Sequence, residues 1–161
     1  MTPRYARSPR GTRARGLVPR NHGKNVTLVA GLRLDGLVAP MTLDGAMDTP
    51  AFEAYAEQVL APALTPGTIV ILDNLAVHHK AAIRGLIEAR GCRLLFLPSY
   101  SPDLAPIELA FSKIKTSLRR AKARARDAVH DAIAQAIDSI TPQDARGYFR
   151  HCGYFSPAQL H

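Results

Sequence analysis

Two acidic side chains, far apart in the chain, stand where they could hold a metal ion together. Asp73 directly follows a short apolar run, residues 69–72, and Glu108 lies in the first turn of a helix predicted from about residue 105 to 126. Hard cations such as Mg²⁺ or Mn²⁺ prefer carboxylate oxygens. Two such ions about 4 Å apart activate the attacking oxygen and stabilise the leaving oxygen in phosphodiester chemistry. The pair therefore predicts a metal-dependent site that cuts and joins phosphodiester bonds.

Each acid also has an ordinary structural explanation. Asp73 can cap a turn together with Asn74, and Glu108 can interact favourably with the positive end of its helix dipole. The site is nevertheless favoured, because ligands gather at the carboxyl ends of parallel strands and the two acids come from separate elements. The neighbouring pair His78 and His79 is a poorer candidate for a metal, since no Cys or third His stands at ligand spacing.

The first elements that must support this site form a hairpin. Strand patterns at residues 26–33 and 37–43 flank Asp35 and Gly36, a strong hairpin signal. Pro40 places the second strand near an edge or at a bulge.

A helix should follow the hairpin and lead to the strand that carries Asp73. Thr49 is its predicted N-cap, with Pro50 at the first helical position. The apolar run 69–72, a helical pattern after residue 80 and a second apolar run, 94–97, then predict two parallel strands joined by a right-handed crossover. We expect the first run to be a central strand covered on both faces. These alternating elements predict the α/β class.

The long helix from about residue 105 to 126 has two faces. Its apolar residues recur at helical spacing, and a polar stripe beside them contains Glu108, Ser112, Lys115 and Arg119. Another amphipathic helix should follow, and Thr141 with Pro142 should open a last short one. The tail aromatics Tyr148, Phe149 and Tyr154 either pack against the sheet or stack on bases, and packing is favoured.

The net charge of +8 indicates a polyanionic partner. Two blocks without any acid, within residues 4–24 and 113–126, hold two thirds of the 21 Lys and Arg residues. A merely soluble basic protein remains the alternative. The predicted nucleic-acid-binding residues are Lys113, Lys115, Arg119, Arg120, Arg10 and Arg13.

Length and composition favour one domain. The 161 residues, 47% of them hydrophobic, suffice for a single core; we expect a basic arm over residues 1–25 and a folded domain over residues 26–161. Two distant cysteines fit a reducing cytosol. No apolar run has the length of a membrane span, and no signal core follows the basic N-terminus, so we expect a cytoplasmic protein.

The residues that carry this chemistry also resemble a known family. The segments ILDNLAVH, residues 71–78, and LLFLPSYSPDLAPIELAFSKIK, residues 94–115, resemble the core of bacterial insertion-sequence transposases of the mariner-like superfamily. Residues 36–64 and the tail YFRHCGY are similar to it too. The resemblance implies a ribonuclease-H-like fold, with a mixed sheet flanked by helices, and the activity of a DDE transposase.

The resemblance also assigns roles. It places the second and third catalytic acids of the family on Asp73 and Glu108, with 34 residues between them, and gives auxiliary roles to Asn74 and His78. It implies Mg²⁺ or Mn²⁺ as cofactor and transposon-end and target DNA as partners, with a homodimer and association with the bacterial nucleoid as further expectations.

Two departures from the family pattern affect the expected activity. Ala105 stands where the family usually has an Asn, which can cap the helix or hold a substrate group whereas Ala cannot. The first strand of the family fold, with the first catalytic Asp, is expected to be missing, as in an N-terminally truncated transposase. Asp35, Asp44 and Asp48 are conceivable substitutes, and Asp44 is the best placed because it follows a strand.

Three functions are compatible with these residues. The first is a DDE transposase catalytic domain that hydrolyses a phosphodiester bond and then transfers the strand, with impaired activity in this chain because one Asp is absent. The second is a non-catalytic DNA-binding remnant of a transposase. The third is a ribonuclease-H-like hydrolase with a rearranged set of acids. A sheet that lacks one strand should also expose an apolar edge and be marginally stable or self-associate.

Overall fold

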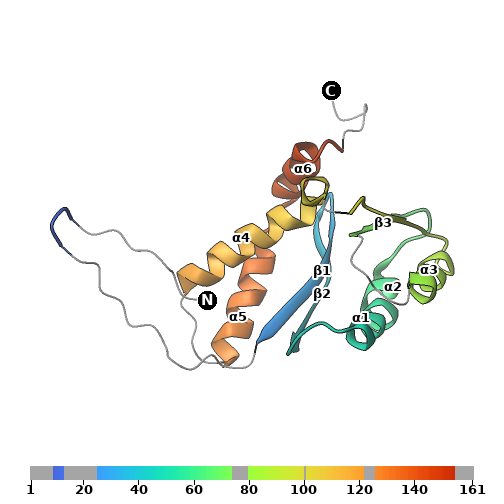
Figure 1. The fold of residues 1–161 in the computed structure, drawn as a ribbon, viewed down its shortest axis with the longest axis horizontal. Helices are drawn as coiled ribbons and strands as arrows, with labels where there is room; N and C mark the ends of the chain where they lie inside the picture. The colour runs from blue at the N-terminus through green and yellow to red at the C-terminus, as the bar shows by residue number, and fades with distance from the viewer. Residues whose placement is uncertain (1–8, 13–24, 74–79, 100, 122–125, 155–161) are drawn as a thin grey trace.

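The computed structural model describes residues 9–12, 25–73, 80–99, 101–121 and 126–154. Figure 1 shows a hairpin of two long strands with helices α4 and α5 on one side and α1 to α3 with strand β3 on the other. In chain order the elements are β1 (Val26–Arg33), β2 (Gly36–Asp44), α1 (Thr49–Tyr55), the π-helical turn η1 (Ala56–Leu60), α2 (Ala61–Ala63), β3 (Ile69–Leu72), α3 (Lys80–Glu88), β4 (Arg93–Phe96), the 3₁₀ turn η2 (Pro102–Leu104), α4 (Pro106–Ala121), α5 (Arg126–Asp138) and α6 (Pro142–His151).

The predicted hairpin is confirmed. Strands β1 and β2 pair antiparallel, and Gly36, with a φ of 132°, opens β2 after the turn. The pairing register shifts between Val29 and Gly31, so the strand with Pro40 bulges as expected. At this bulge Ala39 has a φ of 52°, and its carbonyl accepts a 3.0 Å hydrogen bond from the Tyr55 hydroxyl of α1.

The helix after the hairpin begins one residue earlier than predicted. The N-cap is Asp48, not Thr49, because the Asp48 side chain accepts a 2.9 Å hydrogen bond from the Ala51 amide. Thr49 is the first helical residue, and Pro50 follows it in the first turn. An Asp and a Thr are both good caps, so the sequence alone left the choice between neighbours open.

The predicted pair of parallel strands joined by a helical crossover is confirmed. The predicted position of the first strand, at the centre of a sheet with both faces covered, is not. Strands β3 and β4 pair parallel through α3, and a core around the buried Ile83 and Ile87 covers one face of the pair. The other face is open, with Ile69, Ile71 and Leu95 exposed by 49%, 38% and 44%. The expectation of a central strand covered on both faces is therefore wrong, because among the described residues this sheet has two strands and helices on one side.

Helices α4, α5 and α6 pack together against the β1–β2 hairpin. Buried Ala110 and Ile114 of α4 meet Ala136 of α5 and Ile140 in a second core. Helix α4 is described as far as Ala121, and residues 122–125, over which the prediction continued, lie outside the described residues. Thr141 caps α6 as predicted, in a reciprocal capping box with Asp144.

The α/β class is confirmed, with its strands divided between two small sheets. One sheet is the antiparallel β1–β2 pair and the other is the parallel β3–β4 pair. Each sheet has its own hydrophobic core. Within the described ranges, no helix has the length and apolar character needed to cross a membrane.

Candidate active site

Asp73 directly follows β3 and is solvent-exposed. The strand before it is held in place by its ladder with β4, which the Leu97 amide extends by a 2.8 Å hydrogen bond to the Leu72 carbonyl. Leu72 packs inward against the core of this sheet. The carboxylate therefore stands at the end of a fixed strand, with its side chain free to reach a ligand.

Glu108 lies in the first turn of α4 and is also exposed. The turn η2 leads into this helix, and the Ala105 and Glu108 amides continue it with hydrogen bonds of 3.1 Å to Pro102 and 3.0 Å to Ala105. Pro106 suits the first helical position because its amide would have no partner there. These constraints fix where the helix begins and hence where the Glu108 side chain points.

The C-terminal tail anchors this turn from outside. The Tyr154 hydroxyl donates a 2.8 Å hydrogen bond to the Leu104 carbonyl, and the Tyr154 ring stacks edge-on against Phe149 with 5.8 Å between ring centroids. Burial, and then the neighbouring Cys152, raise the pKa of the Tyr154 hydroxyl above its ordinary value of 10.0. The sequence predicted only that these aromatics pack. No local pattern could have identified a carbonyl 50 residues away as the partner.

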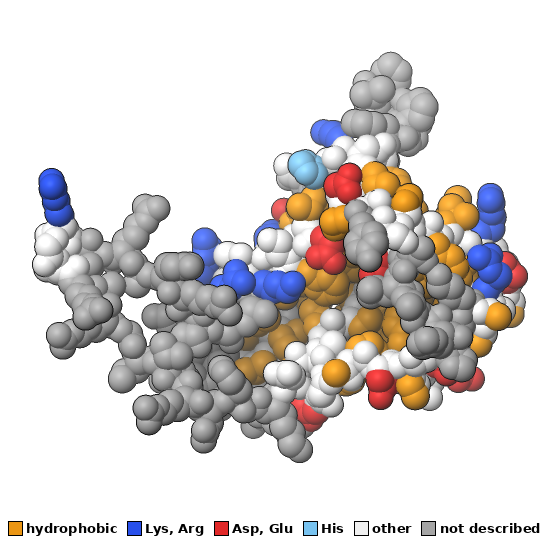
Figure 2. All heavy atoms as spheres, viewed as in Figure 1, with side chains coloured by type: hydrophobic (Ala, Val, Ile, Leu, Met, Phe, Trp, Pro, Cys, Tyr) orange, Lys and Arg blue, Asp and Glu red, His pale blue; other side chains and the backbone are white. Residues whose placement is uncertain are grey.

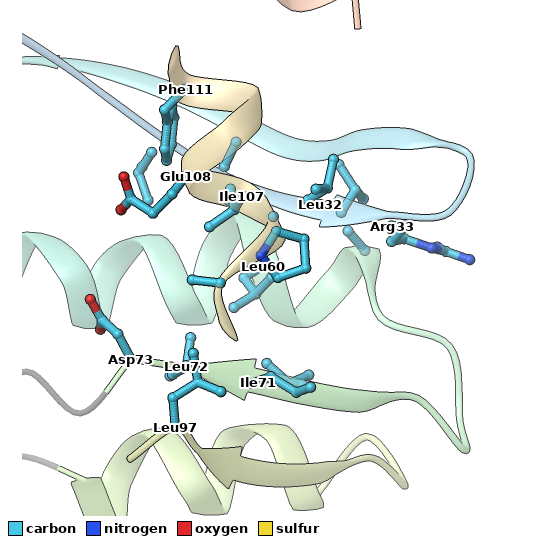
Figure 3. A pocket seen from close by; sticks show the side chains of 18 of the residues that line it. Leu32, Arg33, Leu60, Ile71, Leu72, Asp73, Leu97, Ile107, Glu108 and Phe111 are labelled. Carbon is cyan, nitrogen blue, oxygen red and sulfur yellow. The ribbon is translucent and has the colours of Figure 1, made fainter. Parts of the chain in front are cut away.

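Both carboxylates line one cavity of about 430 Å³ between the two sheets. Figure 3 shows the Asp73 and Glu108 side chains at the same end of it, one from the end of β3 and one from the start of α4. Its walls nearby are apolar and include Leu72, Ile107 and Phe111.

The pair suits a hard divalent cation. Mg²⁺ commonly binds through one or two protein carboxylates together with substrate phosphates and water. Within the described residues no group of three or more Asp, Glu, His or Cys side chains comes together as a metal cluster. Asn74 and His78, the predicted auxiliary residues, lie outside the described residues.

The three conceivable substitutes for a further acid are not part of this cavity wall. Asp48 caps α1, and Asp35 lies beside the Arg33 guanidinium at 3.7 Å on the hairpin turn. Asp44 ends β2. None of the three therefore joins Asp73 and Glu108 in lining the cavity.

The predicted basic residues have different surroundings. Lys115, Arg119 and Arg120 are exposed on α4, and Figure 2 shows Lys and Arg side chains gathered over that part of the molecule. The predicted polar stripe is confirmed as a solvent-facing one, since Glu108 and Ser112 on it are exposed as well.

Lys113 differs from its neighbours on α4. Its ammonium group donates hydrogen bonds of 2.7 Å to the Asp144 carboxylate and 2.8 Å to the Ser139 carbonyl. These contacts pair the Lys113 charge inside the protein, so it is less available to a ligand, and they join α4 to α6. Arg10 is exposed in a short turn between residues 9 and 12, whereas Arg13 lies outside the described residues.

Comparison with known proteins gives a family match and a structural match. The family described as DDE superfamily endonuclease matches residues 1–130. No curated protein matches the sequence.

Among solved structures, the chain is similar to the Mos1 strand transfer complex, with a TM-score of 0.70, 19% identity and coverage of 94% of this chain and 46% of that one. The Mos1 mariner paired-end complex with Mn gives a TM-score of 0.64 at 19% identity, with coverage of 91% and 46%. The Mos1 transposase paired-end complex with left transposon end gives 0.65 at 19% identity, with coverage of 94% and 46%. The chain thus spans less than half the length of the chains it matches, and the likeness confirms the predicted ribonuclease-H-like fold.

Proposed function

Because this chain belongs to the DDE superfamily endonucleases, we propose that it serves DNA transposition as the catalytic core of a metal-dependent transposase. The reaction is hydrolysis of a phosphodiester bond at a transposon end, followed by attack of the freed 3′ hydroxyl on target DNA. One observation carries the proposal: Asp73 and Glu108, which arise from different elements, line the same end of one cavity.

Asp73 and Glu108 would hold the divalent cation, Mg²⁺ or Mn²⁺. When bound, such an ion lowers the pKa of a bound water and stabilises charge on the leaving oxygen. The protein holds the two carboxylates on separate rigid supports, a strand end and a first helical turn, so that neither has to be ordered when the substrate arrives. A structure of a transposase of this fold has been described with Mn, which supports this choice of ion.

Lys115 and Arg119 would orient the DNA. They lie seven and eleven residues after Glu108, about two and three helical turns further along nearly the same face of α4. Phosphates bound to this stripe would run toward the carboxylates. Arg120 would extend the basic surface of α4, Arg10 would contribute from its exposed turn at residues 9–12, and Lys113 contributes less because its ammonium is paired within the protein.

We infer that the isolated 161-residue chain cuts DNA slowly. Within the described residues only two carboxylates line the cavity. Efficient phosphodiester chemistry uses two metal ions, and two carboxylates suffice to hold one hard cation but hold a second one poorly. A non-catalytic DNA-binding role is the second candidate, favoured by this same scarcity of acids. The finer proposals are a bacterial insertion sequence as the source, the bacterial nucleoid as the location and a second copy of the chain as partner.

Mn²⁺ titration calorimetry tests the metal site. We expect the unmodified chain to bind Mn²⁺, and Asp73→Asn or Glu108→Gln each to weaken binding at least tenfold. Asp103→Asn is the matched control, because Asp103 is an exposed acid in η2 that does not line the cavity. Equal Mn²⁺ affinity in all four proteins would overturn the assignment of the site.

DNA binding and nicking of supercoiled plasmid separate the two candidate functions. Lys115→Ala with Arg119→Ala should weaken DNA binding and lower its salt dependence by about one unit of slope for each phosphate that is no longer neutralised. Arg90→Ala with Arg93→Ala, two exposed bases on the β4 side, is the control pair. Slow nicking that Glu108→Gln abolishes favours the transposase. DNA binding with no nicking in Mg²⁺ or Mn²⁺ favours the non-catalytic role.

A further inference from the structure

Helix α6 is hydrogen-bonded to the α4 segment on both sides of Glu108. At the first end of α6, the Asp144 carboxylate accepts a 2.7 Å hydrogen bond from the ammonium group of Lys113, five residues after Glu108. Beyond the other end, the Tyr154 hydroxyl donates a 2.8 Å hydrogen bond to the carbonyl of Leu104, four residues before Glu108. The two helices therefore run in opposite directions here, and Figure 1 shows α6 beside the start of α4.

The two bonded segments match in length. A helix rises about 1.5 Å per residue, so the stretch from Asp144 to Tyr154 and the stretch from Leu104 to Lys113 each span roughly 15 Å. Between the two bonds, the small side chains of α4 and α6 that face inward, Ala110 and Ala145, have no exposed surface. Small side chains at a helix contact let the two axes approach closely. Helix α6 therefore restricts tilting and sliding of the first turns of α4 at both of their ends.

The C-terminal cap of α6 fixes the direction of Tyr154. Gly153 has a φ of 83°, and its amide donates a 3.1 Å hydrogen bond to the Arg150 carbonyl. The Tyr154 amide donates a 2.9 Å hydrogen bond to the Phe149 carbonyl. These two bonds form a Schellman motif, in which the residues at these last two positions commonly make an apolar contact. The rings of Tyr154 and Phe149 make that contact, so backbone and ring together orient the hydroxyl.

The turn η2 connects the Tyr154 contact to Glu108. The Leu104 carbonyl directly precedes Ala105, whose amide donates to the Pro102 carbonyl at 3.1 Å. The Ala105 carbonyl in turn accepts the 3.0 Å hydrogen bond from the Glu108 amide. The Glu108 side chain is exposed, so its position depends chiefly on the main chain beneath it. Tyr154 lines the same cavity as Glu108, which places the contact beside the site.

We propose that Tyr154 is a positioning residue for the metal site: held by α6, it sets where the first turn of α4 places the Glu108 carboxylate relative to Asp73. This inference rests on the proposed function, in which Asp73 and Glu108 share one cation. Metal sites tolerate only small displacements of their ligands, and loss of an outer partner that orients a ligand lowers metal affinity by about 10- to 100-fold. The family match covers residues 1–130, so Tyr154 lies beyond the matched residues.

Mn²⁺ titration calorimetry of the full 161-residue chain tests this role, at a temperature well below the unfolding midpoint of each variant. Tyr154→Phe keeps the ring and removes only the donor to Leu104, and we expect it to weaken Mn²⁺ binding about tenfold. The matched control is Tyr148→Phe, which removes a hydroxyl from the same helix, on a ring packed into the second core near Asp144. It should leave the Mn²⁺ affinity unchanged. Replacement of Tyr154 by para-aminophenylalanine, which keeps a donor at the same position, should restore most of the affinity.

Mn²⁺ affinity separates a positioning role from a purely structural one. A bond that only stabilised the fold would lower the unfolding midpoint when lost and leave the affinity of the folded chain unchanged. Equal affinity in Tyr154→Phe and the unmodified chain would therefore overturn the positioning role and leave the metal site standing. Equal weakening in Tyr148→Phe would also overturn it, since either change would then act by loosening α6 as a whole. Absence of Mn²⁺ binding by the unmodified chain would overturn the metal site, and this inference with it.

Discussion

The two halves of the molecule are stabilised in different ways. In the half built from β3, α3 and β4, apolar burial around Ile83 and Ile87 dominates, and one sheet face stays open to solvent. In the half built from the β1–β2 hairpin and α4 to α6, a comparable apolar core is joined by charged contacts between Lys113 and Asp144. Both halves thus have an apolar core and an ion pair: the contact of Lys113 with Asp144 in the second half joins two helices at 2.7 Å, whereas that of Arg84 with Glu88 in the first half lies within α3 at 3.4 Å.

This difference matters because each half supplies one carboxylate. Asp73 comes from the first half and Glu108 from the second, so the geometry of the pair depends on the joint between them. Two hydrogen bonds brace this region: Tyr55 to the Ala39 carbonyl connects α1 to β2, and Tyr154 to the Leu104 carbonyl holds the turn before α4. The cavity also lies between the two halves, so the pair stands beside a space that these hydrogen bonds do not fill.

The largest effect should come from emptying either core. Ile83→Ala and Ile114→Ala each remove a fully buried side chain, so each should lower the free energy of unfolding by about 2 to 4 kcal/mol. If the halves are separately stabilised, hydrogen exchange should accelerate mainly in α3 and β4 for the first variant and in α4 to α6 for the second. If hydrogen exchange instead accelerated equally in all elements of both variants, the molecule would unfold as one cooperative unit, and the two halves would not be separately stabilised.

A smaller effect is expected from the charged contact that distinguishes the second half. Hydrogen bonds from Lys113 and then Thr141 lower the pKa of the Asp144 carboxyl from 3.8 to about 2. Its contribution is therefore present above the unfolded-state pKa near 3.8 and is lost as the pH falls through about 2.

Asp144→Asn tests this contact by urea unfolding at several pH values. We expect a loss of about 1 to 2 kcal/mol at about pH 6, since the contact is partly solvent-screened and the capping box is lost as well. The loss should shrink toward a pH of about 2. Asp138→Asn, a change to an exposed acid at the end of α5, serves as the control. A loss of stability that does not vary with pH would contradict the assigned role of the charge.

The hydrogen bond from Tyr55 of α1 to the Ala39 carbonyl of β2 should contribute less to the free energy of unfolding than the contact of Lys113 with Asp144. Tyr55 is buried, and burial raises its pKa to about 12. Tyr55→Phe removes the donor to the Ala39 carbonyl and should cost about 1 kcal/mol of unfolding free energy. Phe52→Leu, a change in the adjacent ring of the same helix, separates loss of the hydrogen bond from loss of aromatic packing. An unchanged midpoint for Tyr55→Phe would mean that the joint does not depend on this bond.

The smallest expected change is a gain. Ala39 holds a φ of 52°, a left-handed conformation that glycine adopts without a steric penalty. Ala39→Gly should therefore raise the free energy of unfolding by about 0.5 kcal/mol, measured by thermal and chemical unfolding. Ala30→Gly, in the opposite strand of the hairpin, should destabilise instead, because a glycine there gains no relief. A loss in Ala39→Gly would show that the bulge is unstrained.

The sequence predicted the local elements better than their surroundings. Gly36 and Pro40 identified the hairpin and its bulge because turn and bulge geometry depends on single residues. The exposed face of Ile69 and Ile71 was not predicted, since a short apolar run reads the same in a central strand and in a strand with one open face. The pairing of Lys113 with Asp144 joins residues 31 apart, and a stripe of basic residues cannot reveal which of its members has an internal partner.

The candidate site was predicted in part. Asp73 and Glu108 line a common cavity, as their positions after a strand and in a first helical turn indicated. An exposed sheet edge was expected from the missing strand, but that β1 and β3 are the strands lining the cavity was not predicted, because strand order depends on contacts remote in sequence. The role of Tyr154 at the turn before α4 depends on a contact of the same kind.

Iron-directed cleavage of the polypeptide tests most directly whether Asp73 and Glu108 share one cation. Fe²⁺ with ascorbate and peroxide generates hydroxyl radicals at the bound ion, and these cut the nearby main chain. We predict cuts near both residue 73 and residue 108, both suppressed by excess Mg²⁺ and both lost in Asp73→Asn and in Glu108→Gln. Cuts at only one of the two positions, or cuts at both that survive either substitution, would contradict a shared metal site.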